Sequence, residues 1–261
     1  MLSMSGRRTA TILALLGLLT WAAPASAITF GEPDGNRHPY VGGLVAQVDD
    51  EIIGLCTGTL VAERVFVTAA HCILGGLSFG AQPGSFGVIF DEVFTETSTI
   101  WSGDEAFHSL AFSGGRNNVY DVAVLELDAN PGITPHALLP TAQMLDGLYL
   151  RTQRFEAVGY GAVRDDKRGG PHALGPGGRR LVVEQGYLSR TSSWLTLSMN
   201  PSTGNGGTCF GDSGGPHFLA GTRTIVSVTV TGDAMCRATD RTYRLDTGFA
   251  REFLDDFVAV P

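Results

Sequence analysis

Hydrophobic and polar positions alternate in short runs along most of the chain, and glycine-rich turns separate one run from the next. The runs are rich in valine, isoleucine and threonine, as expected of β-strands that bury one face. They include VGGLVAQV, RVFVTAA, DVAVLEL, RFEAVGYGAV, LVVEQGYL, WLTLSM and TIVSVTVTG. The 35 glycines follow no fixed repeat, which argues against a solenoid or a collagen-like chain. The pattern therefore predicts an all-β protein.

Only the last segment has a helical period. Apolar residues recur there at the spacing of one helical face, at Phe249, Phe253, Leu254 and Phe257. This spacing predicts an amphipathic helix over about 247–258, whose aromatic side chains belong to the core rather than to a binding stripe.

Two segments rich in glycine and proline are expected to be long loops, at 75–87 and 164–180. The second also holds basic residues, interleaved with Asp165 and Asp166. Because the chain is acidic overall, we expect these basic residues to lie on a solvated surface rather than to form a patch for a partner.

A short apolar leader precedes the strand pattern. Arg7 and Arg8 give it a positive start, residues 12–21 are apolar, and small residues stand at 25–27, just before Ile28. This arrangement is typical of a secretory signal peptide, and the apolar run is shorter than the roughly 20 residues of a membrane-spanning helix. We expect residues 1–27 to be removed on export to the extracellular space or periplasm. The arginine doublet alone is weak support for a twin-arginine signal, so we favour the general secretory route.

Removal of the leader leaves 234 residues with a formal net charge of −10, because residues 1–27 hold two arginines and no acidic residue. A chain this acidic repels nucleic acid, and we expect neither a nucleic-acid partner nor membrane association after cleavage. The length suits one large all-β domain or two small subdomains.

All the cysteines lie in the exported part of the chain, where an oxidising environment favours two disulfides. Three pairings are open from the sequence alone, and local pairing would stabilise the fold by about 3 kcal/mol for each closed loop. No CxxC spacing is present, so a metal site is not expected. The cysteines are Cys56, Cys72, Cys209 and Cys236.

Three short stretches carry reactive side chains among small or apolar neighbours: TAAHC with His71, YDVAVLEL with Asp121, and CFGDSGGP with Ser213. A serine attacks a carbonyl at neutral pH only if an imidazole takes its proton, and a buried carboxylate fixes the imidazole tautomer. The glycines around Ser213 allow the N–H groups of Gly211 and Ser213 to point at one developing oxyanion. Each motif alone has an ordinary structural interpretation, whereas the three in this order favour acyl transfer.

These motifs resemble those of the chymotrypsin/trypsin-like serine endopeptidases, as a bacterial-type member, over the whole mature chain from Ile28. The resemblance implies two packed six-stranded antiparallel β-barrels, one over about 28–145 and one over about 146–246, followed by the C-terminal helix. It makes His71, Asp121 and Ser213 the catalytic triad and Gly211 with Ser213 the oxyanion hole. It implies a protein or peptide substrate, no cofactor and no metal, and we expect a monomer.

The resemblance also selects among the open cysteine pairings and assigns substrate-binding residues. It implies disulfides from Cys56 to Cys72 and from Cys209 to Cys236. It places Ser227 in hydrogen-bond contact with the buried aspartate, and it makes Ser227, Val228 and Thr229 the strand with which an extended substrate pairs.

The primary specificity pocket departs from the family's Lys/Arg-selective form. Gly207 stands where an aspartate selects Lys or Arg, and a buried cation there would lack a partner. Val228 and Thr229 replace the usual Trp-Gly, which favours small or medium apolar substrate side chains. Counting back from Tyr243 places Arg241 near the pocket in one register, which would select acidic residues; we favour a surface position for this arginine.

Family members need a new N-terminus whose ammonium pairs with the aspartate before the nucleophile, here Ile28 and Asp212. ITFG keeps the isoleucine and the glycine, but Ala27 replaces the usual Lys or Arg before the cut. We therefore expect signal peptidase itself to generate the active form. Cleavage after Ala25 with later trimming, or an active form that starts downstream, are the alternatives.

The sequence thus predicts a secreted serine endopeptidase that acts through an acyl-enzyme, with an esterase on the same triad as a near relative. The alternative from another class is a catalytically silent protease-fold binding protein, which the intact motifs disfavour. A structural exported β-protein would leave the three motifs as coincidence.

Overall fold

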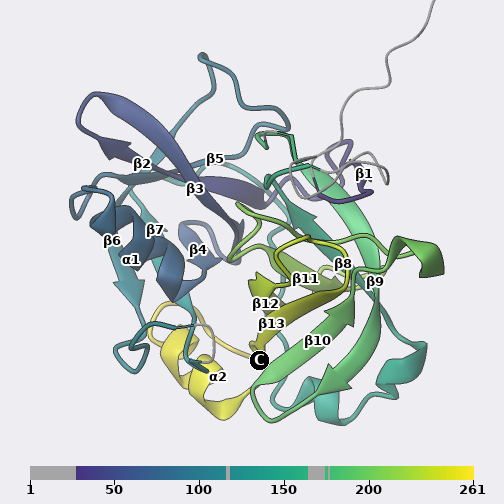
Figure 1. Ribbon diagram of the computed structural model, residues 1–261. Helices are drawn as coiled ribbons and strands as arrows, with labels where there is room; N and C mark the ends of the chain where they lie inside the picture. The colour runs from purple at the N-terminus through teal and green to yellow at the C-terminus, as the bar shows by residue number, and fades with distance from the viewer. Residues whose placement is uncertain (1–27, 116–117, 164–173, 176) are drawn as a thin grey trace, which may run out of the picture.

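The computed structural model describes residues 28–115, 118–163, 174–175 and 177–261. Strands β2 to β7 close into a first barrel in the order β2-β3-β4-β7-β6-β5, with every neighbouring pair antiparallel (Figure 1). These strands are β2 (Val41–Val48), β3 (Glu51–Leu60), β4 (Val65–Thr68), β5 (Phe86–Ile89), β6 (Trp101–His108) and β7 (Ala123–Leu127).

A second antiparallel barrel follows in the order β9-β10-β13-β12-β11-β8, and pairing of β8 with β9 closes it. Its strands are β8 (Arg154–Gly159), β9 (Leu181–Arg190), β10 (Trp194–Ser198), β11 (Pro216–Leu219), β12 (Ile225–Gly232) and β13 (Thr239–Arg244). The short strand β1 (Glu32–Pro33) adds to β9, so the N-terminal segment lies on the second barrel. The predicted fold of two six-stranded antiparallel barrels is confirmed.

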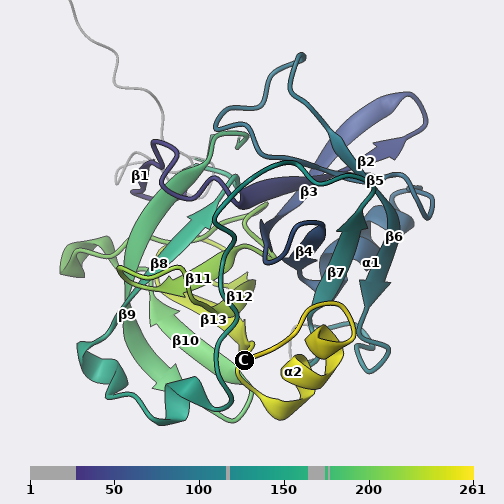
Figure 2. The same cartoon turned by 180° about the vertical axis from the view of Figure 1, so that it is seen from behind.

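The helical elements are short. They are α1 (Ala70–Ser78), α2 (Gly248–Asp255) and the 3-10 turns η1 (Met144–Asp146), η2 (Leu150–Thr152) and η3 (Pro201–Thr203). None of the helices within the described ranges is long and apolar enough to cross a bilayer. Figure 2 shows α2 from behind, beside β7 and α1 of the first barrel. The helix that follows the last strand of the second barrel therefore packs back onto the first barrel.

The core of each barrel comes from the inward positions that the alternating runs supply. Leu44, Phe66 and Leu125 are fully buried in the first barrel, and Phe155 and Leu195 are fully buried in the second. Burial of each such side chain contributes about 1.5–3 kcal/mol to stability.

A buried ion pair ties the N-terminal segment to both barrels. Arg180 is completely buried and donates from Nε to Asp34 Oδ2 at 3.0 Å. Its Nη1 donates to the carbonyls of Val41 and Phe90 at 3.1 and 2.8 Å. Burial alone would raise the pKa of Asp34, but the hydrogen bonds from His38 and the charge of Arg180 hold that pKa at about 2. The pair therefore fixes residues 34–41 against both barrels.

Helix α2 confirms the C-terminal helix of the sequence analysis, and Thr247 caps it by accepting the N–H of Ala250 at 3.3 Å. The aromatic side chains are only partly where they were expected. Leu254 is buried, whereas Phe249, Phe253 and Phe257 remain partly exposed. The helix packs its narrow apolar edge on the barrel and leaves part of the aromatic face open to solvent.

The loop expected at 75–87 is wrong at both ends. Helix α1 extends to Ser78, and strand β5 begins at Phe86. One of the glycines that suggested a loop serves packing instead, because a Cβ on Gly76 would lie 2.6 Å from the ring of Phe86. A small residue is needed where the helix meets the barrel.

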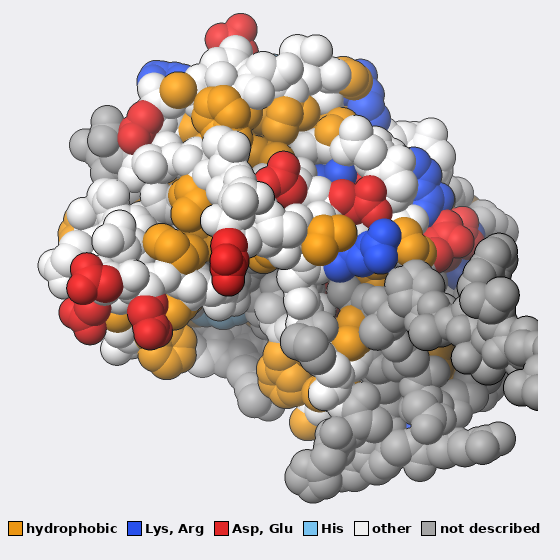
Figure 3. All heavy atoms as spheres, turned by 90° about the horizontal axis from the view of Figure 1, so that it is seen from above, with side chains coloured by type: hydrophobic (Ala, Val, Ile, Leu, Met, Phe, Trp, Pro, Cys, Tyr) orange, Lys and Arg blue, Asp and Glu red, His pale blue; other side chains and the backbone are white. Residues whose placement is uncertain are grey.

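Most of the second expected loop, residues 164–173 and 176, lies outside the described residues. At the end of this segment the interpretation of a solvated basic surface is wrong, since Arg180 is fully buried in the ion pair with Asp34. Figure 3 shows one face of the molecule from above, on which acidic and basic side chains are interspersed with hydrophobic ones.

Candidate active site

The pairing of β4 with β7 brings the histidine and aspartate motifs together. Thr68 at the end of β4 is opposite Ala123 at the start of β7. In an antiparallel pair, the chain that leaves one strand lies beside the chain that enters the other. His71, three residues after Thr68, therefore lies next to Asp121, two residues before Ala123.

Asp121 holds His71 through two hydrogen bonds. The Nδ1 of His71 lies 2.7 Å from Asp121 Oδ2, and the backbone N–H of His71 donates to Oδ1 at 2.9 Å. The aspartate side chain is 2% exposed and the histidine side chain 33% exposed. A buried carboxylate on Nδ1 fixes the orientation of the ring and leaves Nε2 as the nitrogen that can take a proton, which is the arrangement a general base needs.

The serine loop is anchored by backbone contacts on both of its flanks. Gly214 donates to the carbonyl of Thr229 at 2.8 Å, and Thr57 donates to the carbonyl of Ser213 at 2.9 Å. A Cβ on Gly214 would lie 2.1 Å from Thr68 Oγ1, so only glycine lets the loop approach the end of β4 that leads to His71. Ser213, His71 and Asp121 consequently line one pocket of about 330 Å³.

Thr57 is a positioning residue that the sequence analysis missed. Its Oγ1 donates to the carbonyl of Gly211 at 3.0 Å and accepts the N–H of Tyr160 at 3.2 Å. Together with the bond from its own N–H to the carbonyl of Ser213, it holds the peptide unit that follows each of the two residues whose N–H groups were expected to bind an oxyanion. Gly211 adopts φ +98°, a conformation that strongly favours glycine. Within the described ranges, the N–H groups of Gly211 and Ser213 donate to no acceptor.

The substrate-facing part of β12 is shifted from the expected register. Ser227 is fully buried and its Oγ accepts a hydrogen bond from Thr242 at 2.8 Å, rather than contacting Asp121. Val228 is also fully buried in the core. Pairing with the serine loop fixes the register, and the pocket is lined by residues 229–232 of this strand, so of the three expected residues only Thr229 faces it.

The expected pocket floor is also rearranged. Gly207 does not line the pocket; it pairs with Thr29 through two backbone hydrogen bonds of 2.8 and 2.9 Å. The Met199 thioether occupies the space beside it. Arg241 lies over the indole of Trp194 at 4.1 Å and is absent from the pocket lining, which supports the surface interpretation.

A second buried histidine–carboxylate pair lies behind the pocket wall. The sequence analysis identified no motif that predicted this pair. His217 Nε2 lies 2.9 Å from Asp240 Oδ2, and Thr208, which lines the pocket, donates to the same oxygen at 2.7 Å. Both His217 and Asp240 are completely buried, and Asp240 Oδ1 has no hydrogen-bond partner in the described part of the chain. The side chain of Thr208 thus lies between the carboxyl group of Asp240 and the pocket.

Both expected disulfides are present. Cys56 joins Cys72 and ties β3 to the helix that carries His71, while Cys209 joins Cys236 and connects two walls of the pocket. The pairing implied by the family resemblance is therefore confirmed.

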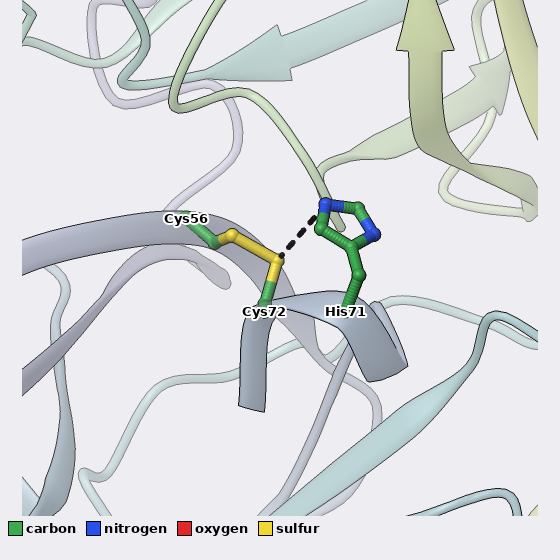
Figure 4. A group of neighbouring side chains, drawn as sticks. All are labelled: Cys56, His71 and Cys72. Atoms are coloured by element: carbon green, nitrogen blue, oxygen red, sulfur yellow. Dashed lines mark hydrogen bonds between the residues drawn. A yellow bond between two sulfur atoms is a disulfide. The ribbon is translucent and has the colours of Figure 1, made fainter. Parts of the chain in front are cut away.

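The first disulfide lies directly against the histidine, as Figure 4 shows. Cys72 Sγ is 3.7 Å from His71 Nε2, and the ligand atoms of Cys56, His71 and Cys72 all lie within 4.8 Å of one another. Metal binding by cysteine requires thiolates. Because the two sulfurs are bonded to each other, these three residues do not form a metal-ligand set.

Ile28 and Asp212 lie in the same interior. Ile28 is fully buried among the side chains of β8 and β9, and its neighbour Thr29 pairs with Gly207. Asp212 is fully buried and accepts the N–H groups of Cys209 and Gly161 at 2.7 and 2.8 Å. Burial raises the pKa of Asp212 to about 7, because two backbone donors only partly replace the lost water.

Comparison with known proteins agrees with this arrangement. The sequence profile of the Trypsin family matches residues 31–251. A protein named "Trypsin" from Saccharopolyspora erythraea is 27% identical over 220 residues, which is 79% of this chain and 88% of that protein. A solved structure titled as HL collagenase superposes with a TM-score of 0.65 at 17% identity, covering 84% of this chain and 93% of that chain, and this likeness bears on the fold alone. The chain belongs to the trypsin family and is a serine endopeptidase.

Proposed function

We propose that the protein hydrolyses peptide bonds through His71, Asp121 and Ser213. The Oγ of Ser213 attacks the substrate carbonyl carbon and transfers its proton to Nε2 of His71, while the N–H groups of Gly211 and Ser213 stabilise the oxyanion. The C–N bond then breaks, the leaving amine takes the proton from His71, and an acyl-enzyme remains. Water, deprotonated by His71, then attacks the acyl carbon. The ester bond to Oγ breaks, Ser213 takes the proton back from His71, and the acid is released. The observation that carries the proposal is that two hydrogen bonds join His71 to Asp121, and that both residues line one pocket with Ser213.

Labelling with a fluorophosphonate tests the triad. We expect covalent labelling of the mature protein, and its loss in both the Ser213→Ala and the His71→Ala variants. Ser109→Ala is a matched control, because Ser109 is a buried serine with no hydrogen-bond partner for its side chain among the described residues and lies outside the pocket. Folded protein that resists labelling would instead support the silent binding protein.

We also propose that the primary pocket selects neutral, small or medium apolar side chains rather than Lys or Arg. Gly207 supplies no charge, and the carboxylate of Asp233, which lines the pocket, accepts hydrogen bonds from the backbone N–H groups of residues 235 and 237–239. Asp240 is shielded from the pocket by Thr208 and held by His217. Cleavage profiling of a peptide library tests this. A dominant Lys or Arg preference that disappears in Asp240→Asn would overturn it and make Asp240 the selecting charge.

We further propose that the protein is exported, acts as a monomer and is activated when signal peptidase cleaves before Ile28. Two observations support the last point: Ile28 is already buried with Thr29 paired to Gly207, and no cationic side chain in the described part of the chain offsets the buried carboxylate of Asp212. An ammonium created at Ile28 supplies that charge. N-terminal sequencing of the secreted active protein tests the site of cleavage.

A further inference from the structure

An open groove lies between the end of β6 and helix α2, on the side of the first barrel where Figures 1 and 2 both place the C-terminal helix. Its volume is about 540 Å³. Its apolar lining comes from Phe107, Leu110, Ala111, Phe249, Phe253 and Phe257. We call it the α2 groove.

The aromatic lining of the α2 groove is preformed. The rings of Phe107 and Phe257 are 4.9 Å apart, and those of Phe253 and Phe257 are 5.4 Å apart. Leu110 at the edge is 96% exposed and is the most exposed large hydrophobic residue of the described chain. A contiguous apolar surface of this kind marks an interaction site more often than isolated exposed residues do.

The rim of the groove is acidic. Glu252 and Asp256 both line it and stand one helical turn apart, where like charges destabilise a helix by a few tenths of a kcal/mol. Arg251 on the same helix forms an ion pair with neither of them, because its guanidinium donates to the backbone oxygens of Pro140 and Pro261. Carboxylates and exposed aromatic faces both attract Arg and Lys side chains. The chemistry therefore fits a segment that combines apolar with basic residues.

Neighbouring residues of one short stretch of chain line the groove and the catalytic pocket. Leu110 and Ala111 line the groove, and Phe112 and Gly115 line the pocket that holds Ser213. Two backbone hydrogen bonds hold this stretch, from Ser109 to the carbonyl of Val122 at 3.1 Å and from Phe112 to the carbonyl of Ser109 at 3.0 Å. The groove therefore lies beside the stretch of chain that forms one wall of the catalytic pocket.

We propose that the α2 groove is an exosite that binds a basic and apolar segment of the protein substrate, outside the residues that are cleaved. This inference rests on the proposed peptidase function. It makes selection of substrates depend on two separate features: the side chain at the scissile bond, and a flanking segment with Arg or Lys next to Leu or Phe.

The test uses an internally quenched peptide that the enzyme cleaves, extended at either end by about 12 residues, which span up to about 40 Å. One series carries flanks of Arg and Leu, and the other carries flanks of Asp and Ser. We expect the basic and apolar flank to raise kcat/KM about ten- to a hundredfold through KM, the effect of burying one or two apolar side chains. The unextended peptide should be cleaved equally by the variants below.

The advantage of the Arg and Leu flank should disappear in Leu110→Glu and fall in Glu252→Lys. Matched controls should retain it: Asp255→Lys lies on the same helix outside the groove lining, and Leu188→Glu replaces a leucine that is 47% exposed on the other barrel. Equal kcat/KM for both flanks overturns the exosite, as does a concentration-dependent dimer that Leu110→Glu abolishes, since the face would then be a contact between copies. Failure to cleave the unextended peptide instead refutes the proposed peptidase function.

Discussion

If the N-terminal ammonium of Ile28 pairs with Asp212, creating this N-terminus should change the free energy of unfolding. The change should depend on pH, because the carboxyl group of Asp212 titrates. The comparison is between two proteins in an inactive Ser213→Ala background, one that starts at Ile28 and one that retains Ala27. In the longer protein the buried carboxylate of Asp212 has only two N–H donors. In the shorter one, the ammonium of Ile28 is expected to neutralise it.

The magnitude follows from the pKa of Asp212, which burial raises from 3.8 to about 7. Between these pH values the folded longer protein binds a proton at Asp212 that the unfolded chain has released, so its stability falls as the pH rises. At about 1.4 kcal/mol per pH unit, the loss from about pH 4 to above pH 7 is about 4 kcal/mol. The protein that starts at Ile28 should lose much less stability over this range, because the carboxylate of Asp212 stays ionised beside the ammonium.

Guanidinium unfolding of both proteins at several values from about pH 4 to about pH 8 gives the two curves. We expect similar stability near the acid end and a gap that widens to a few kcal/mol at the alkaline end. Asp212→Asn removes the titrating group, so it should flatten the dependence in the longer protein. Parallel curves for the two proteins would refute both the pairing of Ile28 with Asp212 and activation by signal peptidase.

Three substitutions test the active site and the buried ion pair of Arg180 with Asp34. Asp121→Asn should lower kcat on an ester substrate by about 10⁴-fold, the effect known for this triad, because His71 is then held in the wrong tautomer; steady-state kinetics with near-normal kcat would contradict the assignment. Thr57→Val removes the hydroxyl bonds to Gly211 and Tyr160 and should lower kcat about ten- to a hundredfold with little change in KM, whereas Thr59→Val, a buried threonine whose hydroxyl has no partner among the described residues, should not. Arg180→Met should lower the free energy of unfolding by about 3–5 kcal/mol, while Arg179→Met, at a partly exposed pair with Glu92, should cost under about 1 kcal/mol. Because the pKa of Asp34 is held at about 2, its contribution is complete above about pH 4 and is lost as the pH falls toward 2, so urea unfolding over this range measures it.

The fold class and the reactive residues were available from the sequence because both depend on local patterns. Strand periodicity needs only the alternation of neighbouring positions, and the motif around Ser213 needs only the small residues that a tight, close-packed turn requires. The same locality explains the errors at 75–87: glycine marks a turn on average, but at Gly76 it serves the contact of α1 with Phe86.

Contacts between distant segments decided which residues line the pocket and which charged side chains are buried. Which residues of β12 face the pocket depends on its register, which Gly214 and Gly215 fix by pairing with Thr229. A shift of two residues along an alternating run leaves the local pattern unchanged, so the sequence does not reveal it. The ionic roles of Arg180 and Asp240 were equally hidden, since each depends on partners that the chain brings from far away in sequence, Asp34 for one and His217 for the other. The sequence by itself determined which residues can react and which strands form. Only the tertiary structure decided which side chains face the substrate and which charges are buried, because strand pairing and burial are properties of contacts between distant segments.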